Sequence, residues 1–175
     1  MLDFCTGRGR NAAALQSAGF AVIAVPDEEA DRFDPFGERG AFAAVLTTHG
    51  LLHGTPKTIA ARLDRLRFCL ADDGELYAAF GSTRDARYGK GRRIGAATFV
   101  PAQGDERGVA HTYFTRERLE NLLRVRFTVE RLWESGVDSV AGSWAHPTQP
   151  LANAVHWFAV ARASTTSASG LDALA

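Results

Sequence analysis

Apolar residues in the first half of the chain gather into short runs separated by polar turns. The runs at residues 20–25 (FAVIAV) and 42–47 (FAAVLT) are continuous, which is typical of strands buried on both faces of a sheet. Shorter apolar runs at residues 1–4 and 76–80 predict two more strands. This half of the chain is therefore expected to supply the centre of a sheet.

Helical patterns lie between these runs. Residues 11–18 predict a helix that stops at Gly19. A second helix is predicted after Thr55, which offers an N-cap, with Pro56 at the first helical position. Its apolar stripe consists of Ile59, Leu63, Leu66 and Leu70. Because strands and helices alternate, the sequence favours an α/β fold with a parallel sheet covered by helices.

The second half has a different pattern. Residues 81–110 are rich in glycine and charge and show little periodicity, so we expect a long loop or lid. The apolar runs at residues 127–133 and 154–161 have no crossover helix between them, which predicts an antiparallel pair at the sheet edge. We expect one domain over residues 1–162 and a disordered tail over residues 163–175.

Composition narrows the function classes. Twenty basic residues balance twenty acidic ones, so no overall field draws the chain to nucleic acid or to an anionic membrane. No apolar run is long enough to span a bilayer, and the first residues lack a secretory signal pattern, so the sequence predicts a cytoplasmic protein. Cys5 and Cys69 form neither a metal-binding spacing nor a disulfide framework.

The clearest chemical pattern is LDFCTGRGR at residues 2–10, between a predicted strand and a predicted helix. A carboxylate followed by small residues and a helix N-terminus is how parallel sheets hold nucleotide-like ligands. Gly7 and Gly9 allow a ligand to approach the backbone, and the N–H groups of the helix face it.

This segment resembles the first motif of class I S-adenosylmethionine-dependent methyltransferases, LDxGxGxGR. Asp3 matches the acidic residue, Gly7 and Gly9 match two of the glycines, and Arg10 matches the final arginine. Cys5 stands where the first glycine is expected, and its side chain would project toward the methionine part of the cofactor. The resemblance implies a three-layer Rossmann-like fold, a mostly parallel sheet and S-adenosylmethionine as the cofactor.

Further cofactor contacts follow from the resemblance. Asp27 is the candidate for the ribose hydroxyls, Asp31 lies in a segment that resembles the adenine contact, and Thr47 and Thr48 end a strand that resembles the fourth of the family. The implied cofactor-binding set is Asp3, Phe4, Cys5, Gly7, Gly9, Asp27, Asp31, Thr47 and Thr48.

Too few residues separate Asp27 from Phe42 for the usual helix and third strand of this family. We therefore expect a sheet trimmed at one edge. An exposed edge of this kind is able to pair with another copy of the chain, so a homodimer is one expectation.

Histidines and a basic loop supply the remaining candidates. His49 and His53 are four apart, but no third or fourth ligand follows at a recognisable spacing, so the sequence predicts no metal site. Glu106 and His111 join a site if the loop at residues 81–110 folds back. The candidates for catalytic groups are His49, Tyr88 and His111, and His156 is expected in the core.

Cations in the same loop suggest how a substrate is held. Arg84, Arg87 and Lys90 follow the strand predicted at residues 76–80, where they would overhang a ligand pocket. Together with His49 they are the candidates for binding a phosphate or carboxylate group of the substrate. The alternative is a solvated, mobile charged loop.

The sequence thus predicts an S-adenosylmethionine-dependent methyltransferase that acts on a small-molecule acceptor. Two alternatives stay open. One is a nicotinamide-dependent oxidoreductase, which the antiparallel final pair and the glycine spacing disfavour. The other is a degenerate methyltransferase fold that serves as a non-catalytic binding or interaction module.

Overall fold

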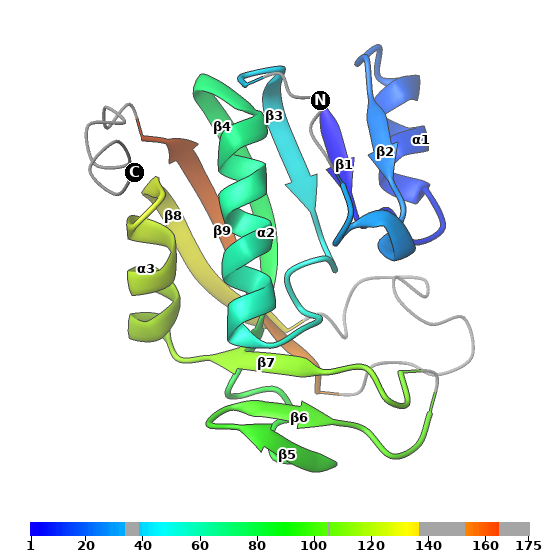
Figure 1. Cartoon of the computed structure of the whole chain (residues 1–175), viewed down its shortest axis with the longest axis vertical. Coiled ribbons are helices and arrows are strands. Elements are labelled where there is room, and N and C mark those ends of the chain that lie inside the picture. The colour runs from blue at the N-terminus through cyan, green and yellow to red at the C-terminus, as the bar shows by residue number, and fades with distance from the viewer. Residues whose placement is uncertain (34–38, 105, 137–152, 165–175) are drawn as a thin grey trace, which may run out of the picture.

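The computed structural model describes residues 1–33, 39–104, 106–136 and 153–164 (Figure 1). One half of its sheet consists of neighbouring parallel strands, in the order β2 (Ile23–Val25), β1 (Leu2–Phe4), β3 (Phe42–Thr47) and β4 (Leu70–Ser82). The order reverses direction at β1, which has β2 on one side and β3 on the other. Sheets of this kind bind ligands at such a switch point, beyond the carboxyl ends of the strands.

The C-terminal part of the sheet is antiparallel. Strand β9 (Val155–Ala163) pairs with β4, and β8 (Phe127–Gly136) pairs with β9. The expected C-terminal antiparallel pair is therefore confirmed, as is the α/β fold class. The short first strand and the strand at residues 42–47 also lie where the sequence placed them.

Within the described residues, the helical segments are α1 (Arg10–Ser17), the 3-10 helix η1 (Asp27–Glu29), α2 (Pro56–Cys69) and α3 (Arg116–Arg124). The Thr55 side chain caps α2 by accepting a bond from the Thr58 N–H at 3.2 Å. Helices α2 and α3 lie on the same face of the sheet (Figure 1).

The apolar core forms mainly between α2, α3 and the sheet. The fully buried large residues include Leu2, Phe4, Ile59, Leu63, Leu66, Leu76, Phe80, Leu119, Leu123 and Phe127. Each such side chain stabilises the fold by roughly 1.5–3 kcal/mol through burial. Three residues of the stripe predicted for the second helix, Ile59, Leu63 and Leu66, are buried on α2, whereas Leu70, the fourth, is buried as the first residue of β4.

The strand expected at residues 20–25 is shorter and more exposed than predicted. Only Ile23–Val25 pair, and Phe20 and Ile23 remain 51% and 44% exposed. The cause is position, because β2 is the last strand on its side in the described sheet and pairs with β1 alone. A continuous apolar run predicts a strand, but it does not show whether that strand lies at the edge or in the centre of the sheet. That this edge pairs with a second copy stays a prediction.

The loop expected at residues 81–110 contains two strands. Strand β5 (Arg92–Gly95) pairs with β6 (Thr98–Val100), which in turn pairs with β7 (His111–Phe114). The expectation was wrong because strands of three or four residues are too short to show periodicity. Gly91, which suggested a loop, instead allows the backbone before β5 to approach the end of β6, since a Cβ at Gly91 would collide with the Val100 carbonyl. Strand β7 then joins the end of β4, which brings this segment back to the sheet.

The expectations about membrane spans and about the C-terminal tail can be compared with the described residues only. Among the described residues, no helix is long and apolar enough to cross a membrane. The tail expected from residue 163 begins at the last residue of β9, and residues 165–175 lie outside the described residues.

Candidate functional site

The glycine loop between β1 and α1 adopts left-handed backbone conformations. The φ angles are 59° at Cys5, 53° at Gly7 and 74° at Gly9. A Cβ at Gly7 or Gly9 would meet no protein atom within 4 Å, so the space beside both glycines is open. Gly9 directly precedes α1, whose first N–H groups face this space. The loop therefore has the backbone geometry that an anionic or nucleotide-like ligand requires.

Cys5 is buried under this loop. Its side chain lies against the backbone of Gly50, in the turn after β3, where a Cβ would be only 2.6 Å from the sulfur. Burial raises the pKa of the Cys5 thiol to about 12, an effect that nearby Arg62 only partly offsets. The thiol is therefore protonated and packed between the ends of β1 and β3.

Two polar side chains beside Cys5 are buried without hydrogen bonds of normal geometry. These are the carboxylate of Asp3, at the register position opposite Leu46 of β3, and the hydroxyl of Thr47. Burial raises the pKa of Asp3, although the Ala12 backbone N–H counteracts part of the effect. Buried polar groups are normally bonded, so this pair at the switch point indicates a place for a polar ligand.

The two candidate acidic residues after β2 are both engaged with the protein. The Gly7 N–H donates to Oδ1 of Asp27 at 3.3 Å, which ties η1 to the glycine loop. Asp31 accepts a bond from Nε of Arg62 at 2.7 Å, and this ion pair lowers the pKa of Asp31. Asp27 thus lies beside the open space, whereas Asp31 is turned toward α2.

Thr48 connects the glycine loop to a second region. Its Oγ1 accepts a bond from Nδ2 of Asn11, on α1, at 3.2 Å and lies 3.2 Å from Nδ1 of His49. Burial lowers the pKa of His49 to about 3, and the neighbouring His53 contributes in the same direction. His49 is therefore a neutral imidazole at the carboxyl end of β3.

His49 borders a concave pocket on the same edge of the sheet. The pocket has a volume of about 340 Å³, including the part open to solvent. Four of the five histidines of the chain line it. The lining residues are His49, Leu52, His53, Gly81, Arg87, Glu106, His111, Thr112, Tyr113 and His156.

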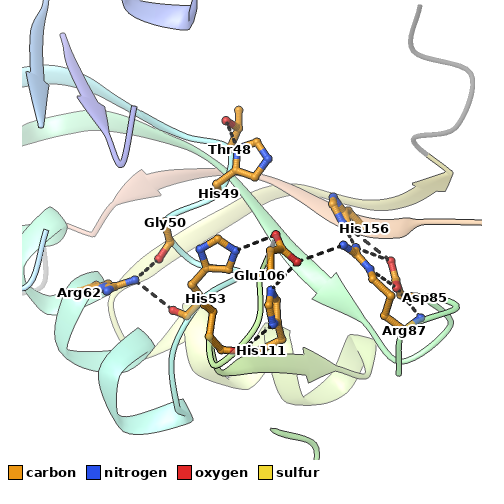
Figure 2. Close-up of polar contacts among 11 residues, drawn as sticks. Thr48, His49, Gly50, His53, Arg62, Asp85, Arg87, Glu106, His111 and His156 are labelled. Carbon is orange, nitrogen blue, oxygen red and sulfur yellow. Dashed lines mark hydrogen bonds and ion pairs between the residues drawn. The ribbon is translucent and has the colours of Figure 1, made fainter. Parts of the chain in front are cut away.

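Glu106 lies between two of these histidines (Figure 2). Its Oε1 is 3.4 Å from Nε2 of His53, and its Oε2 is 3.0 Å from Nε2 of His111. Burial alone would raise the pKa of Glu106, but bonds to the two imidazoles outweigh it and hold the pKa well below its usual range. Glu106 is therefore an anion between two imidazole nitrogens. We name His53, Glu106 and His111 the His–Glu–His cluster.

A second charged group borders the pocket (Figure 2). The buried Asp85 accepts two bonds from Arg87, at 2.9 and 3.0 Å from Nε and Nη2. Nη2 of Arg87 also lies 3.2 Å from Nε2 of His156. Burial, and then the Arg87 charge, lower the pKa of His156 to about 4. His156 is buried, as expected for a core residue, but it also lines the pocket.

Arg62 of α2 holds the turn that carries the pocket histidines. Nη1 of this buried arginine donates to the carbonyls of Gly50 at 2.6 Å and His53 at 3.0 Å. Hydrogen bonds from the Gly54 N–H to Ala110 and an isolated bridge between His53 and His111 connect the turn to β7. The spacing of His49 and His53 would suit a helix, but both lie in the non-helical connection between β3 and α2.

Several predicted residues meet in the pocket and others do not. His49, Arg87 and His111 line it together with Glu106, as expected if the loop folds back. Arg84 pairs with Glu134, and its side chain is 78% exposed. Lys90 is also exposed. Tyr88 packs on Phe99 and Tyr113 and is not among the residues that line the pocket. Sequence analysis missed the roles of Arg62 and Asp85, which no motif marks.

Comparison with known proteins identifies the fold. No protein-family model matches the sequence, and neither does any curated protein. Solved structures do match. One is 1,6-didemethyltoxoflavin-N1-methyltransferase of Burkholderia thailandensis, with bound 1,6-didemethyltoxoflavin and S-adenosylhomocysteine. It has a TM-score of 0.65 at 19% identity, over 93% of this chain and 70% of that chain.

Two further structures agree. A methyltransferase dependent on S-adenosylmethionine, from Methanosarcina mazei, has a TM-score of 0.67 at 17% identity, over 93% of this chain and 91% of that one. Magnesium protoporphyrin IX methyltransferase of Synechocystis, with bound S-adenosylmethionine, has a TM-score of 0.55 at 14% identity, over 93% and 69% of the two chains. The chain has the class I methyltransferase fold.

Within this methyltransferase fold, the glycine loop and the histidine pocket occupy the same edge of the sheet. The loop follows β1, and the pocket lies beyond the ends of β3 and β4. Thr48 and His49 lie between them, since Thr48 contacts α1 and His49 lines the pocket. The arrangement provides one place for a nucleotide-like ligand and an adjoining place for a second molecule.

Proposed function

We propose that the chain transfers a methyl group from S-adenosylmethionine to a small-molecule acceptor that binds in the histidine pocket. The observation that carries this proposal is the glycine loop. It combines left-handed glycines, open space and a helix N-terminus with two unsatisfied buried polar groups. The bound ligands of two structures with the same fold, S-adenosylhomocysteine and S-adenosylmethionine, support it.

Roles for the cofactor-facing residues follow from their positions. The backbone at Gly7 and Gly9 would face the ligand, and Asp27 would turn from the Gly7 N–H toward the ribose hydroxyls. Asp3 and Thr47 would gain hydrogen bonds of normal geometry, which neither has to the described residues. S-adenosylmethionine supplies a methyl group on a positively charged sulfur, so the protein contributes mainly position and the removal of a proton from the acceptor.

The pocket favours an acceptor with polar nitrogen or oxygen atoms. Arg87, which Asp85 holds, lines the pocket, and neutral His49 offers one donor and one acceptor nitrogen. The acceptors named for two structures with this fold are small molecules, 1,6-didemethyltoxoflavin and magnesium protoporphyrin IX. Arg84, Lys90 and Tyr88 are not part of the proposed acceptor site.

None of the three catalytic candidates is placed as a strong general base. His49 has a pKa of about 3, which makes it a weak base at neutral pH. Both ring nitrogens of His111 are engaged, one with the Val109 carbonyl and one with Glu106. Tyr88 lies outside the pocket lining. We therefore assign His49 to acceptor positioning.

Calorimetric titration of the full chain with S-adenosylhomocysteine tests the proposal. We expect micromolar binding. Gly9→Ala should weaken it roughly tenfold, about 1.4 kcal/mol, because the added Cβ occupies the open space beside the loop. Gly104→Ala is the matched control, since Gly104 also has a positive φ, 83°, and no atom within 4 Å of a built Cβ.

The outcome also separates the alternatives. A folded chain that binds no S-adenosylhomocysteine would favour a non-catalytic binding or interaction module. Two observations support that second candidate, namely the Cys5 sulfur packed at the switch point and the bond between Gly7 and Asp27. Binding of NADH in the same titration would instead support the oxidoreductase.

A further inference from the structure

The His–Glu–His cluster lies in the proposed acceptor pocket and gathers three metal-ligating side chains from distant parts of the sequence. His53 comes from the turn before α2, Glu106 from the connection between β6 and β7, and His111 from the first position of β7. One ligating atom from each lies within 4.8 Å of the other two. Two imidazoles and one carboxylate are a donor set that divalent transition metals prefer.

Proton positions within the cluster point to a cation. Nδ1 of His111 lies 3.1 Å from the Val109 carbonyl oxygen, which only accepts, so Nδ1 carries the proton. Nε2 of a neutral His111 then presents a lone pair toward Oε2 of Glu106, only 3.0 Å away. Two acceptors at this distance repel unless a proton or a metal ion lies between them. A metal-ligating histidine usually has this arrangement, in which the other ring nitrogen donates to a carbonyl.

The ligand separations suit a single ion. Zinc bound at about 2.0–2.1 Å to each of four tetrahedral ligands places those ligands roughly 3.3 Å apart. The two nitrogen–oxygen distances in the cluster, 3.4 Å from His53 and 3.0 Å from His111, bracket that separation. All three ligating atoms lie within 4.8 Å of one another, and the rings of His53 and His111 meet edge to face, so binding of one ion requires side-chain rotation that draws the two nitrogens closer together.

The charge around the cluster also favours a cation. Apart from the histidines, the lining and its direct partner hold Asp85 and Glu106 against Arg87, which is two negative charges and one positive. Arg87 is 3.7 Å from Glu106, but Asp85 neutralises it through two hydrogen bonds. Because Asp85 and Arg87 offset each other, the carboxylate of Glu106 is the uncompensated acidic group among the residues that line the pocket.

We propose that His53, Glu106 and His111 bind one divalent transition-metal ion, for which Zn²⁺ is the probe. Three protein ligands leave at least one coordination position open toward the pocket. If the proposed methyltransferase function holds, a hydroxyl or carboxylate oxygen of the acceptor fills that position. The ion would then lower the pKa of an acceptor hydroxyl, which accounts for a pocket without a strong general base.

Metal titration of the full chain, stripped with EDTA and dialysed, tests this site. We expect one equivalent of Zn²⁺ to bind with micromolar or tighter affinity and to raise the melting temperature. Co²⁺ should bind at the same site and give visible absorption bands that Zn²⁺ abolishes. Glu106→Gln keeps the shape of the side chain but removes its charge, so we expect at least about tenfold weaker binding, and His53→Asn should give a similar loss.

Glu120→Gln is the matched control. Glu120 of α3 also takes part in ion pairs, and its side chain is 24% exposed against 20% for Glu106. The proposal is overturned if no stoichiometric Zn²⁺ binds, or if folded Glu106→Gln and His53→Asn bind it as the unaltered chain does. S-adenosylhomocysteine titrated in EDTA reports on the glycine loop alone, so failure of the metal site is distinguishable from failure of the methyltransferase proposal.

Discussion

The sulfur of Cys5 lies so close to Gly50 that a Cβ at Gly50 would be 2.6 Å from it. This contact explains how the loop accommodates a side chain at a position where the methyltransferase motif that it resembles has glycine. Cys5 retains the left-handed backbone of a glycine, with φ at 59°, and directs its sulfur into the gap that Gly50 leaves. The departure from the motif at Cys5 is thus matched by a glycine across the switch point.

The first prediction concerns this contact. Cys5→Gly should strengthen S-adenosylhomocysteine binding by roughly three- to tenfold, because it relieves a strained left-handed conformation and opens space between β1 and β3. Calorimetric titration of both chains measures the change. Cys69→Ala also removes a buried thiol, but in α2, and should leave the affinity unchanged. Unchanged or weaker binding in Cys5→Gly would contradict the proposed loop geometry.

The glycine loop was predictable because its requirements are local. Left-handed backbone at Gly7 and Gly9, a strand before the loop and a helix after it are all encoded within residues 2–18. The capped second helix and the buried run at residues 42–47 are local in the same way. The edge position of β2 depends on which strands pair beside it, and no pattern within residues 20–25 carries that information.

The histidine pocket was not predictable as a unit, because its members meet only through tertiary pairing. Short strands β5 and β6 return the chain to the end of β4 and so place Glu106 and His111 beside His53. The spacing of His49 and His53 predicted no metal site, because the partners of His53 come from the other half of the chain and no local spacing reveals them. Residue types were informative here, whereas spacings were not.

The second prediction concerns thiol reactivity. Both cysteines are buried, and the pKa of Cys5 is raised to about 12, so little nucleophilic thiolate forms at neutral pH. We expect a disulfide reagent such as DTNB at pH 8 to leave both thiols of the folded chain unmodified and to react with both in denaturant. Rapid reaction of one thiol would contradict the packing, and repeating the assay on Cys69→Ala would show whether that thiol is Cys5.

The third prediction concerns Arg62. Arg62→Met keeps the apolar stem but removes donors to the carbonyls of Gly50 and His53, so buried oxygens lose their partners. The free energy of unfolding in urea should fall by about 2–3 kcal/mol, and Zn²⁺ affinity should fall with it because His53 is no longer held. Arg65→Met is the control, since this less buried arginine of α2 also donates to two carbonyls, those of Ala30 and Asp31. Equal losses in the two variants would show that Arg62 has no special role.

The fourth prediction concerns acid stability. Burial holds the pKa of His156 at about 4 and that of His49 at about 3, whereas both titrate near 6.5 when unfolded. The unfolded chain therefore binds more protons below pH 6.5, so the free energy of unfolding decreases as pH falls from 6.5 toward 4. The charges of Arg87 and His111 lower the pKa of His156 further, whereas Asp85 and Glu106 raise it but do not compensate for burial.

Urea unfolding at pH 7, 6, 5 and 4 measures this slope. Each neutral histidine contributes up to about 1.4 kcal/mol per pH unit within its window, or on the order of 3 kcal/mol for His156 between pH 6.5 and 4. His156→Asn and His49→Asn should each flatten the curve there. Tyr113→Phe is the control in the same pocket, because the pKa of Tyr113 is raised to about 12 and this group does not titrate in the window. If both histidine variants kept the full slope, the two imidazoles would have to be solvated and titrating normally in the folded chain, and the pocket would not be the desolvated site described above.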